Sequence, residues 1–130
     1  MTYRTFADVL LLLNDMMDHA RIAESFSRGR TPAELASDLQ YRFSVLYALQ
    51  VVGEVASKVP ESVRLKRPAI SWSLIVGFRH VVVHGYGKVR LDRVAAILDA
   101  EIPGLIREFE ELIPEVEALG ETPLDARAAT

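Results

Sequence analysis

The stretch FADVLLLLNDMMDHARIA, residues 6–23, decides how the chain can fold. Its apolar residues recur in steps of three and four: Phe6, Val9, Leu10, Leu13, Met16, Met17, Ala20 and Ala23. Because an α-helix repeats every 3.6 residues, this spacing forms one face of a long amphipathic helix. Thr5, followed by Asp8 three residues later, is typical of a helix start. Residues 27–30, which include Gly29, are predicted to end the helix.

A short helix and a second long helix are predicted next. Thr31, Pro32 and Glu34 supply an N-cap, a proline at the first helical position and an acid in the first turn of the short helix. Ser37 with Gln40 suggests another capping box, which would open a long helix that stops at Pro60. The apolar face of that helix contains Leu39, Phe43, Leu46, Leu49, Val52, Val55 and Val59. The connection over residues 60–68 is basic, without clear periodicity, and has room for one more helical turn.

The rest of the chain is also predicted to be helical. The segment from Trp72 to His84, capped by Ser71, is expected to form one buried helix. Residues 74–76 and 81–83 also suit buried strands, but two isolated strands would have no sheet to join. A last pattern spans residues 94–116, and Pro103 inside it should kink or split the helix. The prediction is an all-α bundle of four to five helices in a single domain, residues 1–120, with a frayed tail over 121–130.

Composition narrows the classes of protein and of chemistry. The 130 residues include no cysteine, which excludes disulfides, thiolate catalysis and Cys-bound zinc, and which fits a reducing compartment. The longest apolar run near the start covers residues 9–13, too short for a signal peptide or a membrane span. We therefore expect a cytoplasmic protein that has no membrane partner.

Charge is distributed unevenly along the chain. Residues 58–93 carry eight Lys or Arg and two acids, a balance of +6, whereas the rest of the chain carries −9. A basic middle segment suits contact with phosphates in an otherwise acidic chain. Ordinary scatter of charge combined with an acidic last helix is the alternative explanation.

Unusual side chains for a valine-rich helix gather near residue 80: Arg79, His80, His84 and Tyr86. Arginine is seldom buried without a partner, so this helix is expected to present its polar groups to a cleft or an interface. At about 100° per residue, Arg79 and Tyr86 share one stripe, whereas His84 lies about 140° from Arg79. Either Gly85 redirects His84, or the Arg of one subunit meets the His of another across a two-fold axis.

These residues fit a known motif. Residues 79–86, RHVVVHGY, match the pattern R-x4-H-x-Y, and the chain resembles the HepT family of the HEPN superfamily. The apolar run over residues 48–56, with Gly53-Glu54, and the approach through Trp72, Ile75 and residues 77–78 resemble the family as well. The resemblance extends from about Ala48 to Leu112. It implies a HEPN-type helical bundle.

The resemblance also implies a chemistry. HEPN ribonucleases cut RNA without a metal or cofactor, at a site formed across a homodimer. His84 would then transfer protons and Arg79 would hold a phosphate oxygen, roles that suit an imidazole and a guanidinium. His80 stands where the family usually has Asn, and it is expected to support the site. Glu54 either binds Arg79 through a charge-assisted hydrogen bond or is an ordinary solvated acid.

A partner is implied too. HepT toxins pair with an MNT-type nucleotidyltransferase antitoxin that transfers AMP to the motif tyrosine, here Tyr86. The prediction is therefore an endoribonuclease toxin silenced by AMPylation. The alternative is a HEPN interaction module that binds the nucleotidyltransferase without cleaving RNA. A metal held by His80 and His84 would need His19 or a distant acid as a third ligand; nothing in the sequence points to one, and we expect no metal site.

Overall fold

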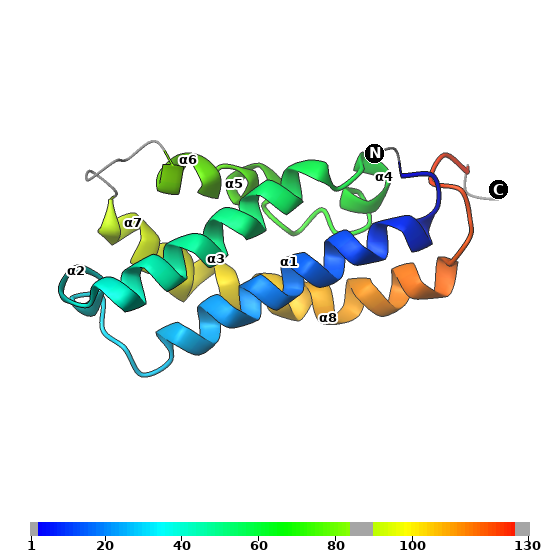
Figure 1. Cartoon of the computed structure of the whole chain (residues 1–130). Helices are drawn as coiled ribbons and strands as arrows, with labels where there is room; N and C mark the ends of the chain where they lie inside the picture. The colour runs from blue at the N-terminus through cyan, green and yellow to red at the C-terminus, as the bar shows by residue number, and fades with distance from the viewer. Residues whose placement is uncertain (1–2, 84–89, 127–130) are drawn as a thin grey trace.

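A computed structural model describes residues 3–83 and 90–126 of the chain. Three long helices, α1 (Phe6–Ser27), α3 (Leu39–Lys58) and α8 (Ile102–Leu119), run side by side along the length of the molecule (Figure 1). α1 contacts both other long helices. The described residues contain no strand, only an isolated bridge between Thr5 and Pro123. The all-α prediction is confirmed.

The predicted start of α1 is confirmed, and it takes the form of a capping box. The Asp8 backbone N–H donates to the Thr5 hydroxyl, and the Asp8 carboxylate accepts from the Thr5 N–H at 2.9 Å. Gly29, just past the helix, has a φ of +74°, a conformation that other residues seldom adopt. The helix therefore ends where the sequence predicted.

The short helix α2 (Glu34–Ser37) is present, but the cap of α3 was predicted wrongly. Asp38, rather than Ser37, is the N-cap, and its side chain accepts from the Tyr41 backbone N–H at 3.1 Å. Ser37 is still helical as the last residue of α2, so only the extended Asp38 can begin the next helix. α3 then runs to Lys58, before Pro60, and α4 (Glu61–Arg64) forms one turn in the basic connection.

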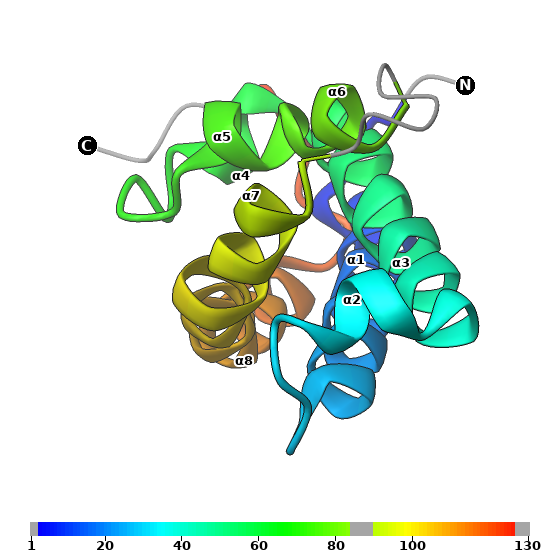
Figure 2. The same ribbon diagram turned by 90° about the vertical axis from the view of Figure 1, so that its left-hand side faces the viewer.

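The single helix predicted from Trp72 to His84 is interrupted. The structure has α5 (Trp72–Val76) and α6 (Phe78–Val83), with Gly77 in a turn between them. The N–H of His80 donates to the Gly77 carbonyl over three residues, a tighter turn than in an α-helix. Ser71 occupies the N-cap position of α5 without a side-chain capping bond. α5 and α6 lie together on one side of the bundle, above α3 and α7 in Figure 2.

The predicted break at Pro103 is confirmed. α7 (Leu91–Ala96) leads into a π-helix, η1 (Ile97–Glu101), and α8 follows with Pro103 in its first turn. Proline has no N–H, and the N–H of Ile102 reaches back five residues to the carbonyl of Ile97. Pro114, which the sequence analysis did not consider, lies inside α8 without ending it.

The buried residues form one hydrophobic cluster between the long helices. Its largest fully buried members are Phe78, Phe109, Leu13, Met16, Leu35, Leu49, Ile102 and Leu112. The residues after Gly120, predicted to fray, pair with the start of the chain as far as the structure describes them: the Leu124 N–H donates to the Arg4 carbonyl at 2.9 Å, and the Phe6 N–H donates to the Thr122 carbonyl. Residues 127–130 lie outside the described part.

Candidate functional site

Arg79 lies in the first turn of α6, on the surface of the bundle. Its neighbour Phe78 is among the largest fully buried side chains and anchors the start of α6 in the core. Helix α6 packs on α3. One residue of this short helix therefore provides the anchor, and the next presents a cation to solvent.

The contact between α3 and the α5–α6 junction is closest at Gly53. A Cβ atom placed on Gly53 would lie 3.0 Å from the Ile75 carbonyl oxygen, 3.1 Å from the Arg79 backbone nitrogen and 3.3 Å from the Phe78 Cβ. Ordinary carbon contacts lie at about 3.5–4.0 Å. The absence of a side chain at Gly53 thus sets how near the backbone of Arg79 approaches α3.

The start of α5 is fixed by Trp72. Its indole N–H donates to the Arg67 carbonyl at 3.1 Å, and its ring lies 6.0 Å from the Phe109 ring of α8. The Arg64 guanidinium lies 5.7 Å from the Trp72 ring centroid and donates to the carbonyls of Ala56 and Val59 at the end of α3. This cluster joins α3, the basic connection and α8 just before the motif begins.

The basic middle segment is therefore only partly available to an anion. Arg67 forms ion pairs with three acids of α8, at 3.6 Å to Glu108, 4.0 Å to Glu111 and 2.6 Å to Glu115. Arg64 caps α3, and Arg90 pairs with Asp92 at 3.0 Å. The hydrogen bond from Arg90 lowers the pKa of the Asp92 carboxyl below its ordinary value. The charge count over residues 58–93 thus overstated the free positive charge.

Two further predicted site residues are described, and two are not. His80 and Glu54 are both exposed. Within residues 3–83 and 90–126, no hydrogen bond or ion pair joins Glu54 to Arg79. His84 and Tyr86 lie outside the described residues, so the structure places neither of them relative to Arg79.

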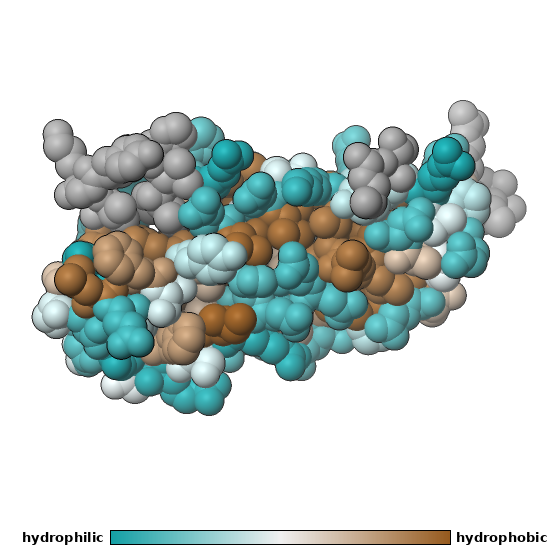
Figure 3. Space-filling model, viewed as in Figure 1, coloured by the Kyte–Doolittle hydropathy of each residue, from teal (hydrophilic) through white to brown (hydrophobic). Residues whose placement is uncertain are grey.

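An apolar face extends over the N-terminal half of α3 and the C-terminal half of α1. Leu39, Phe43 and Tyr47 recur every four residues on α3 and are 55%, 62% and 64% exposed. Ile22 and Phe26 of α1 are also exposed. Figure 3 shows brown surface over these parts of the two helices. Leu39 and Phe43 were predicted to lie on the core face, which is wrong for both, because α3 turns them away from the core. We call Leu39, Phe43, Tyr47, Ile22 and Phe26 the α1–α3 apolar face.

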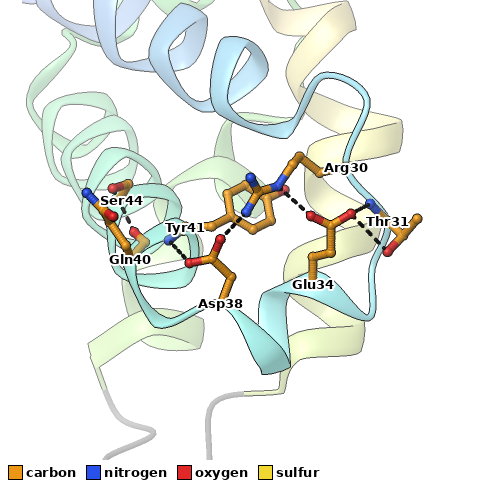
Figure 4. A network of polar contacts seen from close by, with 7 residues as sticks. All are labelled: Arg30, Thr31, Glu34, Asp38, Gln40, Tyr41 and Ser44. Carbon is orange, nitrogen blue, oxygen red and sulfur yellow. Dashed lines mark hydrogen bonds and ion pairs between the residues drawn. The ribbon is translucent and has the colours of Figure 1, made fainter.

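A polar network at the α2 end of the bundle was not anticipated from the sequence. Arg30 forms ion pairs with Glu34 and Asp38 and lies over the Tyr41 ring at 4.3 Å (Figure 4). The Tyr41 backbone N–H, followed by Arg30, lowers the pKa of Asp38, whereas burial raises the pKa of the Tyr41 hydroxyl. Acids at four and eight residues after Arg30 were the available signal. The network borders a cavity of about 460 Å³ that also reaches Leu98 and Asp99 of η1.

The described residues form neither a cluster of metal ligands nor a helix that could span a membrane. Residues 3–83 and 90–126 contain no group of three side chains placed to hold a metal ion. His19, the third ligand considered from the sequence, lies 3.4 Å from the Asp15 carboxylate and 6.3 Å from the Tyr47 ring. None of the described helices is both long and apolar enough to cross a bilayer.

Comparison with known proteins identifies the family. A family model described as "Ribonuclease HepT-like" matches residues 16–112. The chain is 27% identical over 117 residues to "Putative RNase MJ1216" of Methanocaldococcus jannaschii, which covers 90% of this chain and 97% of that protein. It is 26% identical over 100 residues to "Probable ribonuclease HepT" of Thermococcus cleftensis, which covers 77% and 91%. No solved structure matches the chain. Because the family model spans most of the sequence, the chain belongs to the HepT-like ribonuclease family.

Proposed function

We propose that this chain is a single-domain, metal-independent endoribonuclease, the toxin of a toxin–antitoxin pair that acts in the cytoplasm. The observation that carries the proposal is the placement of Arg79 in a chain of a ribonuclease family. Arg79 is exposed, yet its backbone is held against α3 at Gly53 and anchored by Phe78. An exposed cation on a fixed backbone suits a phosphate that must be held in one place.

The proposed chemistry uses the substrate's own nucleophile. The 2′-hydroxyl of RNA attacks the adjacent phosphorus, the bond to the 5′-oxygen breaks, and the products are a 2′,3′-cyclic phosphate and a 5′-hydroxyl. A base must take the 2′-hydroxyl proton and an acid must deliver a proton to the leaving oxygen. An imidazole, with an ordinary pKa of about 6.5, suits both tasks, and we assign them to His84. Arg79 stabilises the negative charge that develops on the phosphate oxygens.

We further propose that the active form is a homodimer. On a straight helix His84 lies about 140° from Arg79, so the two side chains of one subunit do not converge on one small group. A two-fold axis brings the Arg79 of one subunit beside the His84 of the other. The α1–α3 apolar face supports self-association, because two of its three aromatic residues, Phe43 and Tyr47, are more than half exposed and aromatics are enriched at interface cores.

The motif tyrosine suggests how the toxin is silenced. In the proposal a nucleotidyltransferase antitoxin joins AMP to the Tyr86 hydroxyl, with release of pyrophosphate from ATP. Each AMP adds bulk and a negative phosphate beside Arg79, a residue assigned to bind the phosphate of RNA. Supporting roles are assigned to two exposed residues: His80, which follows Arg79 in the sequence, and Glu54, which lies on the facing helix α3.

The experiment compares cleavage of a single-stranded RNA by the purified chain with and without EDTA. We expect equal rates, and products that end in a 2′,3′-cyclic phosphate or its hydrolysis product. Loss of cleavage on chelation, restored by a divalent ion, would overturn the metal-independent mechanism. A chain that cleaves no RNA but still binds a nucleotidyltransferase would instead support the interaction module.

A further inference from the structure

We infer that Gly53 of α3 is a positioning residue for Arg79, an inference that rests on the ribonuclease function proposed above. Gly53 is buried in the middle of a 20-residue helix and is not among the described glycines with positive φ. Its backbone conformation therefore does not require glycine, and alanine favours a helix more strongly. Close approach of a neighbouring backbone is the remaining physical reason for a glycine here.

The neighbouring atoms explain why this approach matters for Arg79. Two of the three atoms that a Cβ at Gly53 would crowd belong to the main chain, the Ile75 oxygen and the Arg79 nitrogen, and the third is the Phe78 Cβ. None of them can turn aside by a change of side-chain rotamer. Any side chain at position 53 must therefore push the α5–α6 junction away from α3, and the Arg79 backbone moves with it.

The short length of α6 makes this displacement consequential. With six residues, α6 is held mainly by its packing on α3, and Phe78 anchors it at the same crossing. Where this displacement tilts the short helix, the end of the long Arg79 side chain moves further than its backbone does. Because misplacement by about 1 Å can cost about 10²-fold in rate, we expect an effect on turnover.

Gly53→Ala and Gly53→Val test the inference, with Gly104→Ala as the matched control. A Cβ at Gly104, in α8, meets only the end of the Arg107 side chain at 3.8 Å. We expect kcat to fall about 10-fold for Gly53→Ala and further for Gly53→Val, with KM for RNA within about threefold. Gly104→Ala should keep both constants and raise the thermal midpoint slightly.

A double-mutant cycle separates positioning of Arg79 from a general structural role. If Gly53 acts through Arg79, Gly53→Ala should lower single-turnover cleavage in the parent but by less than twofold in an Arg79→Ala background. A loss of the same factor in both backgrounds, or a Gly53→Ala variant that cleaves as fast as the parent, would overturn the inference while leaving the ribonuclease function intact. A parent chain that cleaves no RNA removes the proposed function and this inference together.

Discussion

Helices α1, α3 and α8 contain 22, 20 and 18 residues, whereas α6, which carries Arg79, contains six. Each long helix brings an apolar face that extends over several turns and packs against its neighbours. α6 is too short to be stable alone, since a helix of fewer than about 12 residues is marginal in water. Among its described side chains, Phe78 anchors it in the core, and its backbone approaches α3 closely at Gly53. Stability thus resides in the three long helices, and the proposed chemistry resides in a segment that they hold.

The largest effect should come from the motif and should leave the long helices unchanged. Arg79→Ala and His84→Ala are each expected to lower RNA cleavage about 10²–10⁴-fold, the usual contribution of a positioned acid or base. Arg79→Lys should recover only part of the loss, because an ammonium cannot reproduce the two-pronged guanidinium contact. Single-turnover assays measure cleavage, and circular dichroism checks that both variants stay helical.

His80→Asn is the matched control for these two substitutions. It places the amide usual for the family beside Arg79 and should leave cleavage within about tenfold of the parent or raise it. Arg79 and His84 variants that cleave as well as the parent would contradict the assignment of the site.

The second largest effect should come from the long helices and should appear as lost stability. Phe109 is fully buried in α8 and packs against Trp72 at the start of α5. Phe109→Ala should lower the free energy of unfolding by about 3–5 kcal/mol, because it removes apolar contacts and leaves a cavity. Denaturant titration measures the loss, with Leu11→Ala as control.

Leu11 is 81% exposed on α1, so its truncation should change stability by less than about 0.5 kcal/mol. Equal losses for the two variants would show that the buried cluster does not carry the stability assigned to it.

The sequence predicted the long helices better than it predicted the candidate site. The long helices were predicted closely, because steps of three and four along residues 6–23 report the buried face directly. The break at Pro103 was predicted for a local reason, the missing N–H. By contrast, Leu39 and Phe43 were assigned to the core although they are exposed, because an apolar stripe does not reveal what covers it.

The site was predicted less completely, because its geometry depends on contacts between distant residues. The motif singled out Arg79 as a candidate, and the structure adds the burial of Phe78 and the crossing at Gly53. The acids around Arg67 and Arg30 do recur at helical spacing, but this spacing does not reveal which arginine they pair with. His84 and Tyr86, which lie outside the described residues, remain assignments from the motif alone.

A third prediction concerns the α1–α3 apolar face. Phe43→Asp should weaken self-association by about 30-fold or more, because truncating a central aromatic of an interface commonly costs about 2 kcal/mol. Sedimentation velocity over a range of concentrations measures the change. Leu65→Asp is the control: Leu65 is 67% exposed after α4, away from this face. Dissociation by both variants, or by neither, would place the dimer interface elsewhere.

The smallest expected effect is on thermal stability, and it comes from the charge of Asp38, the N-cap of α3. Asp38 accepts a hydrogen bond from the Tyr41 backbone N–H and pairs with Arg30, and both contacts lower the pKa of its carboxyl below the usual 3.8. Asparagine caps helices about as well as aspartate, so Asp38→Asn keeps the cap and removes only the charge.

Because the folded-state pKa of Asp38 is lowered, the contribution of its charge to stability is complete above about pH 3.8 and is lost as the pH falls through the lowered value. The parent should therefore unfold at a higher temperature than Asp38→Asn at pH 6, and the two thermal midpoints should draw together as the pH falls below 3.8. Asp18→Asn, at an exposed carboxylate that forms no hydrogen bond or ion pair with the described residues, should show no such convergence. A difference between parent and Asp38→Asn that stays constant from pH 6 to 2.5 would show that the charge of Asp38 contributes nothing to the start of α3.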